Sequence, residues 1–241
     1  MSRTVQWFDS VASTMTLAAE LAAQDYPHGT VVGADEQRAG VGRYGRAWHS
    51  PKGAGLYFTE ILRLPLKPAD LPVVTLALGL AAAEAIVRVT DLACDLRWPN
   101  DLMIGNRKCA GILVQLHEQA ILAGIGINVN HGEFPPELAA IATSLRIAAN
   151  GREFEREKLL PVLLESIDSH CDLLVREGKD TILRMFSESS SYARGRRVCV
   201  DLADRTITGV TDGLDQAGFL LVRTDDGKRE TILAGGVRPC S

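Results

Sequence analysis

The chain of 241 residues is 46% hydrophobic and 23% charged, and its formal net charge is −4. This composition predicts a globular protein with a sizeable core, and a mildly acidic chain is a poor candidate for general nucleic-acid binding. The N-terminus lacks an apolar core segment, and no uninterrupted apolar run of about 18 residues is present, so we expect no signal peptide, no membrane span and a cytoplasmic location.

The five cysteines follow no metal-binding or redox spacing, and their number is odd. In a cytoplasmic protein, thiols stay reduced. The sequence therefore predicts free thiols at Cys94, Cys109, Cys171, Cys199 and Cys240.

The first third of the chain predicts two helices and two strands. Residues 13–23 are rich in alanine and leucine and indicate a helix that begins at a capping serine. β-Branched residues indicate a strand within 29–37, and an alternating pattern indicates another within 55–64. Residues 70–90 predict a long helix with a proline in its first turn.

The middle of the chain predicts short β segments. Residues 95–101 indicate a strand that runs into a turn. Residues 102–116 hold a Gly-Asn pair between two apolar runs, which is a hairpin signal, and 120–130 is another apolar strand. With the preceding elements, these strands predict an α+β domain in which helices pack on a mixed, largely antiparallel sheet.

The last part of the chain changes character. Residues 152–177 and 179–189 predict helices, and the serine-rich stretch 187–191 predicts a linker. Short apolar runs separated by turns follow, which predicts a small β-barrel. We therefore expect a larger domain over residues 1–188 and a small β domain over 189–241.

A glycine-rich stretch over residues 37–59 contains several cations and no acidic residue. Its Gly40-x-Gly42-x-x-Gly45 spacing is that of a dinucleotide-binding turn, but Pro51 and further glycines follow where such a turn requires a helix. Two interpretations stay open. The stretch is either a mobile loop with solvated arginines or a loop that brings backbone and arginine forks to a carboxylate or triphosphate. The acid-free run of cations favours the second.

Several motifs resemble those of the biotin–protein ligases and occur in the order of that family. They span most of residues 9–145. They are STM at 13–15, GVGRYGRAWHSPKGAGLY at 40–57, RWPNDL at 97–102, RKCAGILVQ at 107–115 and GIGINVN at 124–130. No single motif is specific, but together they identify the chain as similar to this family.

The resemblance implies a catalytic domain of the class II synthetase-like type, followed by a small SH3-like β-barrel. It implies a ligase that forms biotinyl-5′-AMP from biotin and ATP and then transfers biotin to one lysine of a biotin carboxyl carrier protein. Mg²⁺ is expected with ATP, held mainly through the nucleotide phosphates. The residues fit such a reaction, because a carboxylate that attacks a triphosphate needs neutralising cations and exact positioning rather than a protein nucleophile.

The resemblance also implies the residues of the site. The biotin-binding set comprises Ser13, Thr14, Gln37, Val41, Gly42, Arg43, Lys108, Gly111, Gly124, Ile125 and Gly126. The ATP- and adenylate-binding set comprises Arg43, Arg46, Trp48, Asn100, Asp101, Lys108 and Asn128. The catalytic set comprises Arg43, Arg46, Asp101 and Lys108. Simpler roles stay open: a helix cap for Ser13, a solvated hairpin residue for Lys108, and a turn after Pro99 for the Asn-Asp pair.

The chain departs from the family pattern at several positions. Val41 stands where the loop usually carries arginine, and it can only pack, so we expect an apolar lid over biotin. Met15 stands where some relatives carry asparagine, and Gln115 where an acid is common. No aromatic residue occurs near Ala142, where some relatives stack a tryptophan on the adenine. Trp48 is expected to anchor the loop by packing.

Three alternatives remain. A lipoate–protein ligase shares the fold and the adenylate chemistry, although the Ser-Thr and Gln37 set favours biotin. A DNA-binding, biotin-responsive repressor needs a helix-turn-helix segment, for which we expect no room before Ser13. A non-catalytic effector-binding module is disfavoured by the complete set of charged site residues. Either a monomer or a homodimer fits the sequence.

Overall fold

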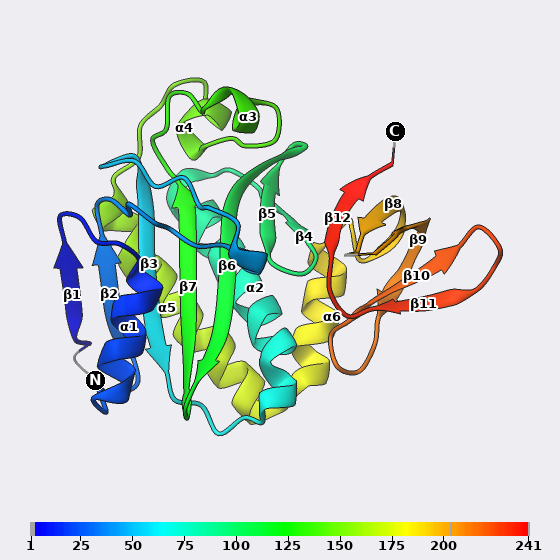
Figure 1. Ribbon diagram of the computed structural model, residues 1–241, viewed down its shortest axis with the longest axis horizontal. Coiled ribbons are helices and arrows are strands. Elements are labelled where there is room, and N and C mark those ends of the chain that lie inside the picture. Colours follow the sequence, from blue (N-terminus) through cyan, green and yellow to red (C-terminus); the bar gives the residue numbers. More distant parts are fainter. Residues whose placement is uncertain (1–2, 203, 241) are drawn as a thin grey trace.

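The computed structural model describes residues 3–202 and 204–240, which form two β-sheets with helices on the larger one (Figure 1). The elements up to the last helix are β1 (Val5–Phe8), α1 (Thr14–Ala23), β2 (Thr30–Ala34), η1 (Arg43–Gly45), β3 (Gly55–Leu62), η2 (Pro68–Asp70), α2 (Leu71–Thr90), β4 (Asp95–Arg97), β5 (Asp101–Ile104), β6 (Arg107–His117), β7 (Ala120–Asn128), α3 (Pro136–Ala139), α4 (Leu145–Ala148), α5 (Arg156–Glu177) and α6 (Lys179–Ser189). The remaining strands are β8 (Arg194–Asp201), β9 (Thr206–Leu214), β10 (Leu220–Thr224), β11 (Arg229–Ile232) and β12 (Gly236–Pro239).

The larger sheet is mixed and largely antiparallel, as the sequence predicts. Its strand order is β1-β2-β3-β7-β6-β5-β4, with β1 parallel to β2 and the other neighbours antiparallel. Every residue of β3 is buried, because helices cover both faces of the sheet at this point. Strand β7 lies between β3 and β6, so the glycines of its GIGIN run lie in the middle of the sheet.

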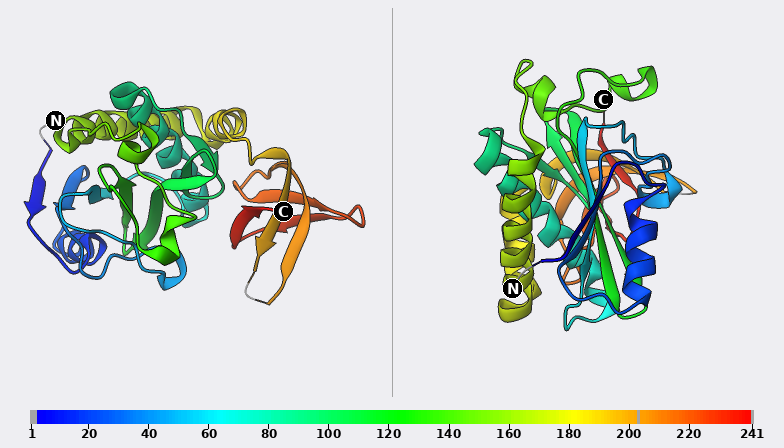
Figure 2. Two further views of the ribbon diagram at one scale, coloured as in Figure 1. Left: turned by 90° about the horizontal axis from the view of Figure 1, so that it is seen from above. Right: turned by 90° about the vertical axis from the view of Figure 1, so that its left-hand side faces the viewer.

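Helices cover the two faces of the sheet separately (Figure 2). Helix α1 packs Met15, Ala18 and Leu21 against strand residues such as Val32 and Leu122 on one face. Helices α2 and α5 pack against the opposite face and against each other. The result is the α+β arrangement expected from the periodicities.

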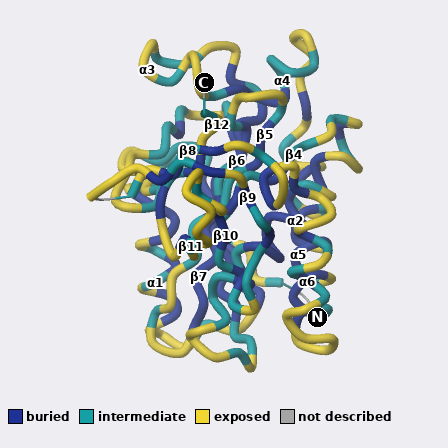
Figure 3. The backbone as a smooth tube through the Cα atoms, turned by 90° about the vertical axis from the view of Figure 1, so that its right-hand side faces the viewer, coloured by how far each residue is buried: buried dark blue, intermediate teal, exposed yellow. Residues whose placement is uncertain are grey.

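Helix α2 is a core helix. Together with the preceding turn, the segment Pro68–Thr90 is long and apolar enough to cross a membrane by length and composition, but 67% of that apolar window is buried within the fold. The buried residues lie in the interior of the molecule, and the loops at its ends are largely exposed (Figure 3). The apolar character of α2 therefore belongs to the hydrophobic core.

The C-terminal strands form a second, antiparallel sheet in the order β11-β10-β9-β8-β12, beside the β4–β5 end of the larger sheet (Figure 1). Trp98 Nε1 donates a hydrogen bond of 2.9 Å to the carbonyl of Gly218 and joins the two parts. The predicted serine linker is wrong over its first half, because α6 continues to Ser189. The Ser187 hydroxyl donates to the Leu183 carbonyl at 2.7 Å, which keeps the serine compatible with a helix.

The prediction of five free thiols is also wrong, because Cys199 and Cys240 form a disulfide. Strand β12 pairs with β8 so that Arg238 lies opposite Cys199, and this register brings Cys240 within bridging distance, with a Cα–Cα separation of 5.2 Å. The free thiols are Cys94, Cys109 and Cys171.

Candidate active site

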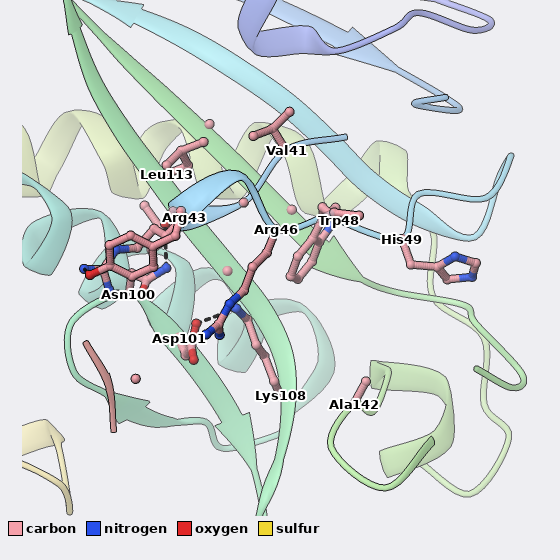
Figure 4. A pocket seen from close by; sticks show the side chains of 18 of the residues that line it. Val41, Arg43, Arg46, Trp48, His49, Asn100, Asp101, Lys108, Leu113 and Ala142 are labelled. Atoms are coloured by element: carbon pink, nitrogen blue, oxygen red, sulfur yellow. Dashed lines mark hydrogen bonds and ion pairs between the residues drawn. The ribbon is translucent and has the colours of Figure 1, made fainter. Parts of the chain in front are cut away.

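A cavity of about 440 Å³ lies over strands β6 and β7, beneath the glycine-rich loop (Figure 4). Its walls come from the loop between Val41 and His49, the turn over residues 97–101, the segment 134–142 and, from the C-terminal domain, residues 235–238. Segments that are far apart in the sequence thus meet around one space.

Nearly all of the expected site residues line this cavity. They are Thr14, Gln37, Val41, Gly42, Arg43, Arg46, Trp48, Asn100, Asp101, Lys108, Gly111, Gly124, Ile125, Gly126 and Asn128. Ser13 is the exception. It occupies the N-cap position of α1 without a side-chain capping bond, and its buried hydroxyl has no hydrogen-bond partner among the described residues.

The glycines on the floor of the cavity make room for Trp48. A Cβ atom on Gly126 would lie 2.4 Å from Trp48 Nε1, and one on Gly111 would lie 3.1 Å from the same ring and 2.9 Å from Lys108 Nζ. The indole therefore rests directly on strand backbone, where any side chain would displace it. Trp48 Nε1 is buried over Gly126 and has no hydrogen-bond partner among the described residues.

One end of the cavity carries a neutral polar network. Gln37 Oε1 accepts from the Thr14 amide at 2.9 Å and from the Thr14 hydroxyl at 3.1 Å. Thr59 donates to the Thr14 hydroxyl at 2.9 Å, and Gln37 Nε2 donates to Ser50 at 3.1 Å. Because Nε2 has a second hydrogen and the Thr14 oxygen a second lone pair, this end offers one donor and one acceptor to a ligand.

Asp101 lies between two cations at another wall. Its Oδ1 is 2.5 Å from Lys108 Nζ, and its Oδ2 accepts from Arg97 Nη2 at 2.6 Å and from Arg97 Nε at 3.2 Å. Burial alone would raise the pKa of the Asp101 carboxyl, but Lys108 and Arg97 outweigh it, so that the pKa lies below its usual value. Lys108 is therefore held in an ion pair, with 26% of its side chain exposed, and is not a solvated hairpin residue.

The glycine-rich loop places Arg43 and Arg46 on the wall of the cavity. Arg43 Nη1 donates to Asn100 Oδ1 at 3.1 Å, while Arg46 extends toward Asp101 and Lys108 (Figure 4). The loop forms one short helical turn, η1, and extended backbone follows it at Arg46, so no helix opens at the third glycine of the spacing. This excludes the dinucleotide-binding interpretation of the glycine spacing. Val41 lines the cavity with 44% of its surface exposed.

The segment 134–142 forms a wall near Lys108. The Lys108 amide donates to the Ile141 carbonyl at 2.8 Å, so this segment is bonded to β6 beside the lysine. Asn128 Nδ2 donates to the Thr143 carbonyl at 3.0 Å. Phe134 also lines the cavity and stacks on His131, with ring centroids 5.0 Å apart. An aromatic ring is therefore present on this wall, although not at position 142.

Two family models match the chain. The model of the Biotin/lipoate A/B protein ligase family covers residues 7–131, and that of the Biotin protein ligase C terminal domain covers residues 195–237. The chain belongs to the biotin/lipoate A/B protein ligase family.

Individual members of this family are similar over most of the chain. The bifunctional ligase/repressor BirA of Bacillus subtilis strain 168 is 33% identical over 241 residues, which is 97% of this chain and 74% of that protein. The biotin–[acetyl-CoA-carboxylase] ligase of Mycobacterium tuberculosis is 29% identical over 95% of this chain and 86% of its own. A solved structure of a biotin protein ligase from Aquifex aeolicus, in complex with biotin and ATP, matches with a TM-score of 0.87 at 30% identity, covering 98% of this chain and 99% of the other.

Several residues of this ligase-family cavity were missed by sequence reasoning. Arg97 lies in the RWPNDL motif, but nothing local indicates that it binds Asp101. Thr59 does not line the cavity but supports it by donating to the Thr14 hydroxyl, and within β3 it looks like an ordinary strand position. From the C-terminal domain, Asp201 and Arg238 line the cavity and pair with each other at 2.8 Å, which only the packing of the two sheets reveals.

The residues that line the cavity fit a metal ion that is brought by a substrate better than a metal ion held permanently by protein side chains. Among the described residues, no group of three or more His, Cys, Asp or Glu side chains could hold a metal ion. Asp101 and Asp201 supply the carboxylates of the cavity lining. Mg²⁺ commonly takes one or two protein carboxylates plus phosphate oxygens, so these two aspartates are the residues that would contribute to such an ion.

Proposed function

We propose that this chain is a biotin–protein ligase, which forms biotinyl-5′-AMP and transfers biotin to a lysine of a biotin carboxyl carrier protein. One observation carries the proposal. The same cavity holds a neutral donor–acceptor pair at Gln37 and Thr14 and a cationic wall at Lys108, Arg43 and Arg46. Biotin has the matching ends, a urea and a carboxylate, on either side of an apolar ring and chain.

The cationic wall serves the first step. A carboxylate oxygen forms a bond to the α-phosphorus of ATP, and the bond from that phosphorus to pyrophosphate breaks. Both reactants are anions, so catalysis requires cations that neutralise the approach and hold the groups in line. Lys108 and Arg46 extend toward the same region, and Arg43 is fixed beside them on Asn100.

The second step needs little from the protein beyond retention of the adenylate. The carrier lysine attacks the carbonyl carbon of the mixed anhydride, a C–N bond forms, the C–O bond to the phosphate breaks, and AMP leaves. Because the adenylate is reactive toward water, the loop must exclude solvent until the carrier binds. Trp48, seated on the glycine floor, anchors the loop in this role.

Mg²⁺ enters the proposal with ATP. When bound, it would neutralise phosphate oxygens, and Asp101 Oδ1 would be available to it once Lys108 turns to the substrate. A cytoplasmic location is part of the proposal, since the reaction consumes ATP.

The test is biotin-dependent exchange of labelled pyrophosphate into ATP, run beside lipoate and octanoate. We expect exchange with biotin alone, because the other acids lack a urea for the Gln37–Thr14 pair. Equal exchange with lipoate would instead assign the chain to the lipoate branch of its family. Exchange with none of the three would refute the ligase proposal.

We further expect no sequence-specific DNA binding by these residues. The net charge is −4, and the long helices α1, α2 and α5 are packed on the sheet. Non-specific binding fades as salt rises, so a gel shift on a defined operator that persists at physiological salt would contradict this.

A further inference from the structure

Tyr44, at the tip of the glycine-rich loop, bonds to the C-terminal domain. Its hydroxyl accepts a hydrogen bond of 2.9 Å from the backbone amide of Gly235, a residue 191 positions away in the turn between β11 and β12. Gly235 has φ of +136°, and a Cβ atom there would lie 3.0 Å from the Asp201 carbonyl. Only glycine fits this turn closely, because a side chain there would be strained.

The backbone of Tyr44 is held in a conformation that needs support. Its φ is +59°, in the left-handed region that residues with a side chain seldom adopt. Tyr44 is 61% exposed, so burial does not hold it there. Two groups of contacts favour this conformation. Backbone bonds close the turn around Tyr44, from the Gly42 amide to the Arg46 carbonyl at 2.7 Å and from the Arg46 amide to the Arg43 carbonyl at 3.3 Å, and the tyrosine hydroxyl adds its own bonds to Gly235 and Arg43.

The same hydroxyl also positions Arg43. Arg43 Nη2 donates to Tyr44 Oη at 2.9 Å, and the guanidinium carbon lies 4.9 Å from the centroid of the tyrosine ring. On the other side, Arg43 Nη1 donates to Asn100 Oδ1. The guanidinium is thus held between the β4–β5 turn and a tyrosine that is itself tied to the C-terminal domain.

We propose that Tyr44 is a positioning residue that couples the loop to the C-terminal β domain and through this coupling holds Arg43 over the cavity. The coupling is geometric and stands on the contacts above. Its consequence, retention of the adenylate, rests on the proposed ligase function. Loss of the hydroxyl should let the loop open more often and should release the adenylate before transfer.

The experiment compares Tyr44→Phe with Tyr26→Phe in the full chain. The first change removes the hydroxyl and keeps the ring under Arg43. Tyr26 follows α1 and is not among the residues that line the cavity, so its variant is a matched control for losing a phenol hydroxyl. A Tyr44→Leu variant adds the loss of the ring.

Two readouts separate the proposal from the ligase function. Trypsin cleavage after Arg43 and Arg46, without substrates, should be about 3- to 10-fold faster in Tyr44→Phe than in wild type, faster still in Tyr44→Leu, and unchanged in Tyr26→Phe. The half-life of biotinyl-AMP on the enzyme should fall in the same order.

Cleavage of Tyr44→Phe at the wild-type rate would overturn the coupling. Faster cleavage with unchanged adenylate retention would overturn the positioning of Arg43. An absence of adenylate in the wild type would refute the ligase proposal and leave the cleavage result as the test of the coupling.

Discussion

Asp101 Oδ1 lies 2.5 Å from Lys108 Nζ, so the carboxylate and the lysine of two separate motifs form an ion pair on the wall of the cavity. Arg97 occupies the other carboxylate oxygen. The lysine can therefore turn toward a substrate anion without leaving Asp101 as an unpaired buried charge. Such a second cation matters because an uncompensated charge in a protein interior is strongly destabilising.

Lys108→Ala should lower the rate of biotin adenylation by roughly 100- to 1,000-fold, because it removes a cation from the developing phosphate charge. It should also lower the free energy of unfolding by roughly 1–2 kcal/mol, less than for a fully broken buried pair, since Arg97 remains on Asp101. Pyrophosphate exchange and urea unfolding measure the two effects. Arg107→Ala, at an exposed position beginning the same strand, is the control. Adenylation by Lys108→Ala at the wild-type rate would show that the lysine is wrongly assigned.

Arg97→Gln should shift the acid limb of the pH–rate profile to higher pH. Arg97 and Lys108 keep the pKa of Asp101 depressed, so removal of Arg97 raises that pKa and protonates the carboxyl at a pH where it is normally ionised. A group with a depressed pKa stabilises the fold at higher pH and loses this contribution as pH falls, so the variant should lose stability mainly near neutral pH, and its stability should fall less than that of wild type on acidification. Exchange rates measured from about pH 3 to 7 test this, since an unperturbed aspartate titrates near 3.9. Arg97→Lys should shift the limb less, and an unshifted limb in Arg97→Gln would exclude the role.

Arg43→Gly should shorten the half-life of biotinyl-AMP on the enzyme and should label lysines of bystander proteins. The change removes charge-assisted contacts worth about 1.5–3 kcal/mol each and adds a flexible residue to a loop already rich in glycine. Val41→Arg, at a position with 44% of its surface exposed, should leave overall ligation within a few-fold of wild type. Unchanged retention in Arg43→Gly, or a large gain in Val41→Arg, would mean that another residue holds the loop closed.

Gly126→Ala should weaken biotin binding, because the added Cβ atom would lie 2.4 Å from Trp48 Nε1 and must displace the indole from the floor of the cavity. We expect the KM for biotin to rise by roughly 10- to 100-fold. Gly79→Ala in α2 is the control, since its Cβ would meet Leu96 at an ordinary 3.5 Å. A KM for Gly126→Ala equal to that of the control would show that the tryptophan does not need the glycine floor.

His131 should make the fold less stable in acid. Burial, aided by the neighbouring His49, lowers the pKa of His131 to about 4. An unfolded histidine titrates near 6.5, so between this pH and about pH 4 the unfolded state binds more protons than the folded state. The free energy of unfolding therefore decreases as the pH is lowered through this window, by roughly 2 kcal/mol at about pH 5. Urea unfolding of wild type and His131→Phe at several pH values measures the difference. The stability of the variant should depend less on pH, and a slope equal to that of wild type would contradict the role of His131.

Much of the fold follows from local patterns in the sequence. The periodicity of alanine and leucine predicts α1 and α2, and β-branched or alternating runs predict β2, β3 and β7. Each of these elements buries one or two apolar faces, and such faces are visible in the local sequence. The motif residues could also be assigned to one site. Gly124, Gly126 and Asp101 were grouped through their resemblance to a family, and the cavity brings them together.

Other features were decided only by tertiary structure. Ser13 and Thr14 are adjacent, yet only Thr14 lines the cavity and binds Gln37. Ser13 is the extended N-cap residue and Thr14 the first helical residue, so the two have different backbone conformations. Tyr44 meets Gly235 because two sheets pack side by side.

The disulfide between Cys199 and Cys240 likewise depends on the register of β12 with β8. Composition and spacing determined the kinds of element and the chemistry that they carry. Which distant groups touch was decided by packing, since contacts between residues far apart in the chain leave no periodic signal in the sequence.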